Sequence, residues 1–210
     1  MNWRLIVPAE DWQNPIPLPE EQMALLETVA QRLGLRVHRD SEQRKFYLGL
    51  PGKSIPWHQR TVTLSEAAAA PYKTTGIYRA APLLEIDPKE PLSPHFRAGE
   101  FFPNDPKCKY LRISPALIEA LEKLRQKIGG AAITIHSAYR PPAYNAAIGG
   151  VSNSAHIDGL AADISANGVS TDQLYRAADE VIGGTGGVGY YPRAEFVHID
   201  VRGHFARWTG

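Results

Sequence analysis

The sequence predicts an α+β protein whose C-terminal part is a small mixed sheet with flanking helices. From residue 93 onward, helical periodicity and short apolar strand patterns mix without the regular alternation that is typical of a doubly wound sheet. The first 63 residues carry a helix pattern and a hairpin pattern of their own, which predicts a smaller α+β unit. We therefore expect an N-terminal unit over residues 1–63, a linker or surface strap over 64–92, and the main domain over 93–210.

The N-terminal unit is expected to contain one helix and one hairpin. Pro19 is placed to open the helix and Gly34 to end it, and the apolar residues between them share one face: Met23, Leu26, Ala30 and Leu33. Two short apolar stretches at 35–38 and 45–48 flank a polar turn at 40–43, which is the pattern of a hairpin. Residues 64–94 contain several prolines and no sustained period, which is why we expect a linker or strap there.

The main domain is expected to mix helices and short strands. Ser114 and Pro115 form a cap followed by a proline at the first helical position, and helical spacing continues to Ile128. The further predicted elements are a strand at 132–135, a short helix at 142–148, a strand at 161–165, a helix from Ser170 or Thr171 through Ile182, and a strand at 195–201. The glycines at 183–189 are expected to form a flexible bridge into the last strand.

The composition limits the partners and the kind of metal site. Lys and Arg total 23 against 22 Asp and Glu, so a net charge of +1 gives no electrostatic reason to expect nucleic acid or an anionic membrane. Cys108 is the only cysteine, so no intramolecular disulfide can form, and a metal ion would be held by His, Asp or Glu. The sequence shows no apolar run of about 18 residues and no signal peptide, so we expect no membrane insertion and no export route of its own.

Two short stretches carry the residues that point to chemistry. His156 precedes a glycine turn and Asp163 follows that turn on a predicted strand, while His198 lies on the last predicted strand. Two histidines and one carboxylate are a ligand set that leaves a catalytic zinc ion a fourth position for water. The pattern predicts one Zn²⁺ site, although the spacing of His156 and Asp163 alone is a weak signal.

Three separated motifs in the right order, and a lead-in segment before them, resemble those of the M15 zinc peptidases, a family that includes D-alanyl-D-alanine carboxypeptidases, D-Ala-D-Ala dipeptidases and phage endolysins. Residues 154–163 read Ser-x-His-x-x-Gly-x-Ala-x-Asp, and residues 137–145 resemble the Tyr-Arg segment that precedes this motif. Residues 196–202 resemble the closing strand, and residues 94–101 resemble the lead-in of the M15_3 branch. The resemblance implies a zinc-dependent peptidase that hydrolyses peptide bonds involving D-amino acids in bacterial peptidoglycan, as a carboxypeptidase or an endopeptidase.

The resemblance also implies roles for single residues. Three residues match the zinc ligands of the family: His156, Asp163 and His198. Arg140 matches the arginine that binds or polarises the substrate near the scissile carbonyl, although it could instead pair with a carboxylate as a structural residue. Tyr139 and Ser154 are candidate substrate contacts, and Ser154 could equally cap its turn.

Two carboxylates compete for the role of general base. Glu195 lies three residues before His198, as in the Glu-x-x-His of the dipeptidase and endolysin branches, but it can serve only if the strand bends there. Asp200 lies two residues after His198 on the same face, so it could orient that ligand or act as the base itself. We prefer Glu195. His136, beside the Tyr-Arg segment, is expected to be a packed or supporting residue rather than a ligand.

Two other classes of function stay open at this point. The chain could be a non-catalytic peptidoglycan-binding module that retains a zinc site, or a structural protein of a phage or cell envelope. The expected partner is the peptidoglycan stem peptide, and the protein is expected to be a monomer. It would reach this substrate outside the cytoplasm, or after the enzyme is released from the cell as phage lysis enzymes are. Which bond is cut is not fixed by these motifs. Because no ligand or base candidate precedes residue 93, we expect residues 1–92 to be dispensable for the chemistry.

Overall fold

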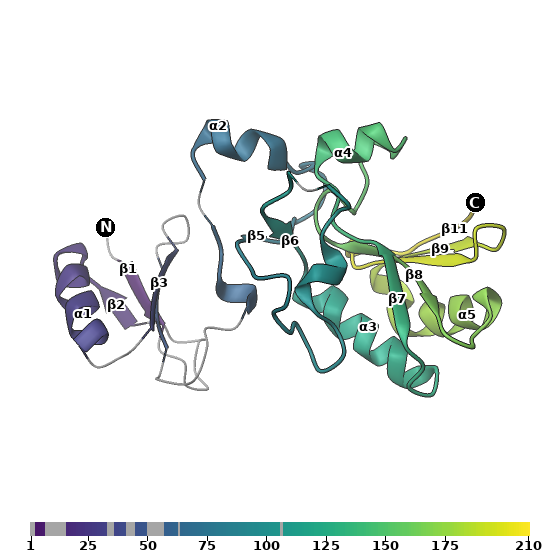
Figure 1. The fold of residues 1–210 in the computed structure, drawn as a ribbon, viewed down its shortest axis with the longest axis horizontal. Coiled ribbons are helices and arrows are strands. Elements are labelled where there is room, and N and C mark those ends of the chain that lie inside the picture. Colours follow the sequence, from purple (N-terminus) through teal and green to yellow (C-terminus); the bar gives the residue numbers. More distant parts are fainter. Residues whose placement is uncertain are drawn as a thin grey trace. The chain divides into compact units, whose positions relative to one another are not determined.

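The structure is a computed structural model in which two compact units are separated along the chain (Figure 1). It describes residues 3–6, 16–32, 36–40, 45–49, 57–62, 64–105 and 107–210. The first unit comprises Met1–Thr63 and the second Leu64–Gly210. Both contain helices and strands, so the predicted α+β class is confirmed.

The first unit contains a helix and a four-stranded sheet. The strands β1 (Trp3–Ile6), β2 (Ile16–Leu18), β3 (Arg36–Asp40) and β4 (Lys45–Gly49) are arranged in the order β2-β1-β4-β3. The helix α1 (Glu20–Arg32) begins directly after Pro19 and buries Met23 and Ala30, as its apolar spacing predicts. The predicted hairpin is confirmed by the antiparallel pairing of β3 with β4, and Gly34 and the turn at 41–43 lie outside the described residues.

Residues 64–92 pack into the second unit instead of only connecting the two units. They contain α2 (Glu66–Ala69) and β5 (Leu83–Leu84), which pairs antiparallel with β6 (Leu111–Arg112). The guanidinium of Arg112 donates hydrogen bonds to the carbonyl oxygens of Ala81 at 2.7 Å and Tyr72 at 3.0 Å. Leu84 is fully buried. The segment is therefore a strap that contributes core residues to the second unit.

The second unit is built around a five-stranded mixed sheet with the order β11-β9-β10-β8-β7. Its strands are β7 (Ile133–Ser137), β8 (Ala161–Ala166), β9 (Gly187–Tyr191), β10 (Phe196–Asp200) and β11 (Ala206–Thr209). Its helices are α3 (Pro115–Lys127), α4 (Pro142–Ala147) and α5 (Thr171–Ile182). Each predicted helix and strand of this region is present, and Ser170 caps α5 by accepting a hydrogen bond from the backbone N–H of Gln173 at 3.2 Å.

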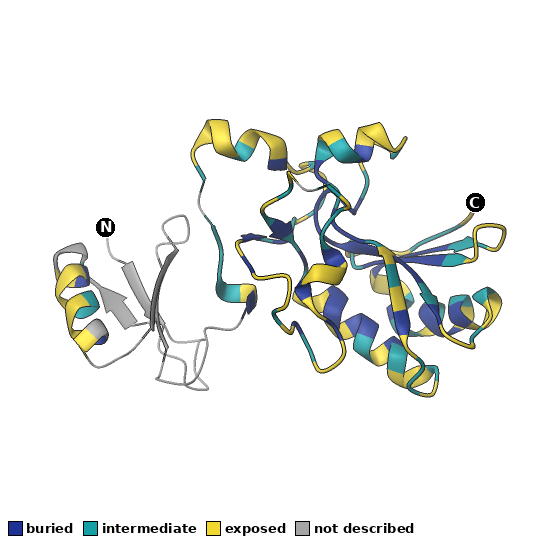
Figure 2. Ribbon diagram, in the orientation of Figure 1, coloured by how far each residue is buried: buried dark blue, intermediate teal, exposed yellow. Residues whose placement is uncertain are grey.

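The two faces of this sheet have different roles. Helix α5 packs on β8, β9 and β10, and α3 packs beside α5, so both helices cover the same face (Figures 1 and 2). Tyr190 of β9 meets Tyr175 of α5 on that face, with ring centroids 5.0 Å apart. Side chains alternate along a strand, so Val197 and Ile199 of β10 point to the helices while His198 points to the other face. The polar motif residues are thereby gathered on the face that lacks α3 and α5.

The expectation of a flexible glycine bridge over 183–189 is wrong in its second half. Residues from Gly187 onward form β9, which pairs with β10 on one side and with β11 on the other. A Cβ atom at Gly187 would lie 2.2 Å from Oδ2 of Asp200, and one at Gly189 would lie 2.6 Å from the ring of Trp208. These glycines are thus positions of close approach within a sheet, not positions of chain flexibility.

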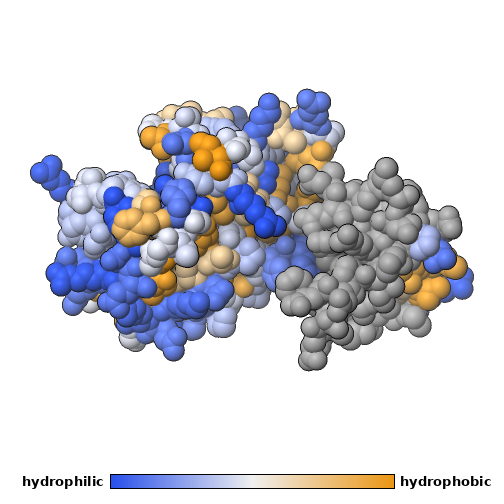
Figure 3. All heavy atoms as spheres, turned by 180° about the vertical axis from the view of Figure 1, so that it is seen from behind, coloured by the Kyte–Doolittle hydropathy of each residue, from blue (hydrophilic) through white to orange (hydrophobic). Residues whose placement is uncertain are grey.

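The second unit carries a few large apolar side chains on its surface. Hydrophobic residues are scattered among hydrophilic ones on the side shown in Figure 3. The large apolar side chains that are most exposed in this unit are Ile77, Ile148, Val151 and Phe205. None of the helices in the described ranges has the length and apolarity needed to cross a bilayer.

Candidate metal centre

The loop that carries His156 is held in place from two sides. Gly159 adopts a φ of +70°, and a Cβ atom there would lie 2.6 Å from the backbone of Arg112, so only glycine fits this turn. The carboxylate of Asp158 is fully buried and accepts hydrogen bonds from the backbone N–H of Thr75, at 2.9 Å, and from the Thr75 hydroxyl. The strap therefore fixes the turn that separates His156 from Asp163.

Three side chains meet on the open face of the sheet. Asp163 of β8 and His198 of β10 are direct cross-strand partners, and His156 reaches them from the loop before β8. His198 Nδ1 lies 2.9 Å from Asp163 Oδ1 and 3.2 Å from His156 Nε2, and the third side of this triangle, from His156 Nε2 to Asp163 Oδ1, is 3.2 Å. All three residues are buried.

This triangle fits a small divalent cation. Donor atoms that bind zinc at about 2.0–2.1 Å in a tetrahedral site lie roughly 3.3 Å apart, which is close to the separations observed here. Two imidazole nitrogens and a carboxylate oxygen are also donors that zinc accepts readily. The three residues can therefore hold such an ion without a change of fold.

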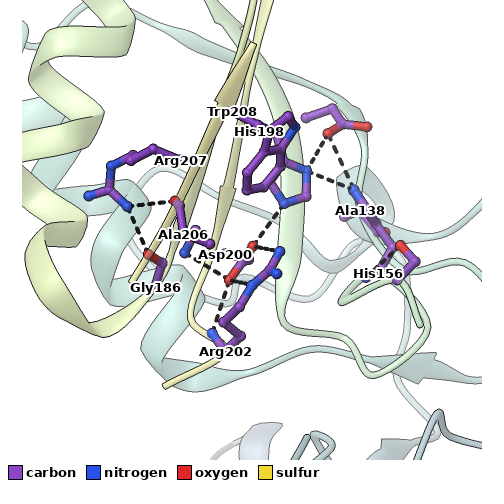
Figure 4. A network of polar contacts seen from close by, with 12 residues as sticks. Ala138, His156, Gly186, His198, Asp200, Arg202, Ala206, Arg207 and Trp208 are labelled. Atoms are coloured by element: carbon purple, nitrogen blue, oxygen red, sulfur yellow. Dashed lines mark hydrogen bonds and ion pairs between the residues drawn. The ribbon is translucent and has the colours of Figure 1, made fainter. Parts of the chain in front are cut away.

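Outer partners orient both imidazoles toward the triangle (Figure 4). His156 Nδ1 donates to the carbonyl oxygen of Ala138 at 2.6 Å, and His198 Nε2 donates to Asp200 Oδ2 at 3.0 Å. The other ring nitrogens, His156 Nε2 and His198 Nδ1, are therefore directed into the triangle. Asp200 is itself fixed, because its Oδ1 accepts from the backbone N–H of Gly187 at 3.0 Å and from Arg202 Nε at 2.7 Å. Such supporting hydrogen bonds are typical of metal-binding histidines.

Burial and hydrogen bonding set the charge of the cluster. Burial lowers the pKa of His156, against the opposing effect of Asp163, and this favours a neutral imidazole. Burial acts to raise the pKa of Asp163, but its contacts with His156 and His198 outweigh burial and hold that pKa well below its usual range. Burial acts to lower the pKa of His198, yet hydrogen bonds to Asp163 and Asp200 raise it overall. The cluster is thus arranged to attract one unit of positive charge or more, as a proton or a metal ion.

The structure ties Arg140 to the ligand set. Its Nη2 donates to Asp163 Oδ2, and its Nε donates to the Ser137 hydroxyl at 2.7 Å. The side chain of Arg140 keeps 15% of its surface exposed. In this arrangement Arg140 orients Asp163, so that the carboxylate presents Oδ1 to both histidines.

The other two candidate substrate contacts differ in their surroundings. Ser154 is half-buried, and its hydroxyl lies 3.4 Å from the backbone N–H of His156, which it can accept as a turn cap. Tyr139 is fully buried, and burial raises the pKa of its hydroxyl above the usual range. Because the Tyr139 ring lies in the core, we do not retain it as a substrate contact.

Glu195 lies at the bend on which its assignment depends. It is the last residue of the turn between β9 and β10, and its φ of 56° is left-handed, which is uncommon for a residue other than glycine. Its side chain is exposed and lines a pocket together with Phe196 of β10 and with His136 and Ser165 of the neighbouring strands. Glu195 therefore faces this pocket, which none of the three cluster residues lines, whereas Asp200 is enclosed by Arg202 and β9.

One neighbour of the centre was not foreseen from the sequence. Trp208 of β11 lies beside His198, with ring centroids 5.0 Å apart, and its indole N–H donates to the Tyr191 hydroxyl at 2.8 Å. The guanidinium of Arg202 lies 5.3 Å from the same ring. Nothing in the motifs marks Trp208, because its position depends on the parallel pairing of β11 with β9.

The comparison with known families agrees with this centre. The sequence model described as Peptidase M15 matches residues 96–200, a stretch that contains all three residues of the cluster. The chain belongs to the peptidase M15 family. This membership confirms the resemblance inferred from the motifs, and the matched region ends at Asp200 of β10.

Curated relatives of this M15 chain carry one printed function. The peptidoglycan L,D-endopeptidase MepK of Escherichia coli K12 is 32% identical over 110 residues, which are 50% of this chain and 59% of that protein. A Haemophilus influenzae protein named "Probable peptidoglycan L,D-endopeptidase MepK" is 31% identical over 106 residues, which are 47% of this chain and 55% of that protein. The match thus spans little more than half the length of these relatives.

Proposed function

We propose that this M15 chain is a zinc-dependent endopeptidase that hydrolyses peptide bonds involving D-amino acids in peptidoglycan stem peptides. The observation that carries the proposal is the buried triangle of His156, Asp163 and His198, which lies inside the region that matches the family. The names of the relatives favour endopeptidase over carboxypeptidase action.

Each residue of the centre has a role in the proposed reaction. His156, Asp163 and His198 would hold the zinc ion, which when bound supplies Lewis acidity that polarises the scissile carbonyl and makes water a stronger acid. Glu195 accepts a proton from the attacking water and delivers it to the leaving amine, as a general base and then a general acid. Its exposed side chain at the pocket suits this exchange better than the enclosed carboxylate of Asp200.

The remaining polar residues hold the ligands in place. Asp200 fixes the ring of His198 through Nε2, and Arg140 fixes Asp163 through Oδ2. Both contacts leave the atoms of the triangle directed at one another, so that the site needs little reorganisation. The contact with Asp163 supports a positioning role for Arg140, the structural alternative, over direct polarisation of the substrate.

Digestion of defined muropeptides tests the function. The protein is loaded with one equivalent of Zn²⁺, and products are identified by mass spectrometry. We expect cleavage of an internal peptide bond that involves a D-amino acid. A protein that binds zinc and muropeptides without any cleavage would instead support the non-catalytic binding module, and removal of only a terminal residue would indicate a carboxypeptidase.

A further inference from the structure

A pocket lies on the same face of the sheet as the candidate metal centre, and its lining residues do not include His156, Asp163 or His198. It encloses about 560 Å³, within the usual range for small-molecule sites. Ser165 follows Asp163 by two residues on β8, and Phe196 precedes His198 by two residues on β10, and both line the pocket. Since residues two apart on a strand share a face and lie about 6.6 Å apart, the pocket begins roughly one substrate residue away from the ligands.

The walls of the pocket are polar and apolar in about equal parts. Its lining residues are His136, Ser165, Val169, Ser170, Thr171, Pro192, Ala194, Glu195 and Phe196. His136 is exposed on β7, and its Nε2 lies 2.7 Å from the Ser165 hydroxyl on β8. Within the described parts of the chain, this is the one polar contact of His136. An exposed imidazole with a single contact is not needed for the core.

The pair of His136 and Ser165 retains a hydrogen-bond donor under either tautomer. If Ser165 donates to Nε2, the neutral imidazole carries its proton on Nδ1 and can donate it to a ligand. If Nε2 donates to Ser165, the hydroxyl proton of Ser165 is available instead. In both cases one N–H or O–H group can be offered to an acceptor in the pocket.

We propose that this pocket binds the side group of the stem-peptide residue next to the scissile bond, and that His136 selects side groups with a carboxamide oxygen. The acceptor is the C=O oxygen of a carboxamide, because a carboxylate would be repelled by the Glu195 carboxylate in the same pocket, and the apolar wall around Phe196 holds the carbon chain of that side group. This inference rests on the proposed peptidase function and names a specificity residue for it. His136 acts on binding, and the reacting atoms are left to the centre and Glu195.

Three versions of one cleaved peptide test the proposal. The residues that flank the scissile bond carry an acid, an amide or an alkyl group of similar length. For the parent protein, KM is expected to be about tenfold lower for the amide than for the alkyl peptide, the effect of one hydrogen bond, and the acid should gain less because Glu195 lines the same pocket. In His136→Ala this ratio is expected to fall to about one with kcat and zinc content unchanged. His136→Gln, which keeps a donor, restores part of the preference.

A matched control is His95→Ala, which removes an exposed histidine that pairs with Glu122 outside the pocket and should leave the ratio at its parent value. An unchanged ratio in His136→Ala, or a parent protein that does not discriminate among the three peptides, overturns the subsite. If the parent cleaves none of them, the proposed function fails, and calorimetric binding of the three peptides to the zinc-loaded parent still decides the subsite. Equal affinities in that titration would reject it.

Discussion

The strap is expected to stabilise the loop that carries His156 and Asp158 through a contact made by Thr75. The substitution Thr75→Val tests this, because valine has nearly the same shape as threonine. The substitution removes the hydroxyl that donates to the buried Asp158 carboxylate and leaves the backbone N–H bond of 2.9 Å in place. A hydrogen bond to a charged group contributes about 1.5–3 kcal/mol, and the loss is near the upper end when the acceptor is fully buried. The free energy of unfolding of the second unit should therefore fall by about 2 kcal/mol.

Urea denaturation followed by far-UV circular dichroism measures this change. With a slope of about 2 kcal/mol per M, the midpoint should move to lower urea by roughly 1 M. Thr134→Val, at an exposed position on β7, is the matched control and should shift the midpoint by less than about 0.3 M. Because Asp158 is two residues from His156, zinc affinity should fall in Thr75→Val as well. Equal midpoints for Thr75→Val and the control would refute the idea that the strap holds this loop.

Three further predictions concern the reaction and the domain boundary. Glu195→Gln should keep one zinc per chain and lower kcat by about a hundredfold or more, measured by muropeptide hydrolysis, and a nearly active variant would transfer the role to another group. Asp200→Asn should weaken zinc retention about tenfold or more, measured by competition with a chelator, while kcat of the loaded protein falls less than in Glu195→Gln; intact zinc affinity with a dead enzyme would exchange the two roles. Deletion of residues 1–63 should preserve folding and activity on soluble muropeptides, whereas deletion of 1–91 should abolish the cooperative unfolding transition, because it removes the buried Leu84 and both Thr75 bonds. A folded, active chain from residue 92 would show that the strap is dispensable.

The last of these predictions revises an expectation drawn from the sequence. The absence of ligand candidates before residue 93 suggested that residues 1–92 are dispensable for the chemistry. The structure shows that the strap supplies the partner of Asp158 and receives hydrogen bonds from Arg112. These contacts join residues far apart in the chain. The proline-rich strap has no helical or strand periodicity from which such contacts could be predicted. A chemical motif therefore located the candidate ligands, but it did not mark the limits of the folded unit.

Local patterns predicted the regular elements well where one face is apolar. Helices α3 and α5 and strands β8 and β10 occur where spacing and capping place them. The predictions from sequence fail at residues whose type depends on a contact with a residue that is distant in the sequence. Gly187 and Gly189 have no room for a side chain because Asp200 and Trp208 approach them closely. In the sequence alone, a run of glycines predicts a flexible segment instead. Strand β11 was missed for a related reason, since three half-buried residues and one exposed residue gain their strand conformation from pairing with β9.

The sequence predicted which residues meet at the candidate site better than it predicted the role of each residue. The convergence of His156, Asp163 and His198 follows from the motif and from the cross-strand pairing of β8 with β10. The function of Arg140 depends on which carboxylate it meets, and the sequence left that open. The burial of Tyr139 was also hidden, because an aromatic residue before an arginine can belong to either the core or the surface.

The most direct test of the central claim is the zinc content of the parent and of His198→Ala, measured by mass spectrometry of the metal after metal-free purification, reloading and gel filtration. The account predicts one zinc per chain for the parent and a severe loss of zinc in His198→Ala, because a three-ligand site does not tolerate the loss of a ligand. Muropeptide hydrolysis by the same samples should follow the zinc content. A parent that retains no stoichiometric zinc, or a His198→Ala variant that retains it fully, would contradict the assignment of this cluster as the metal centre.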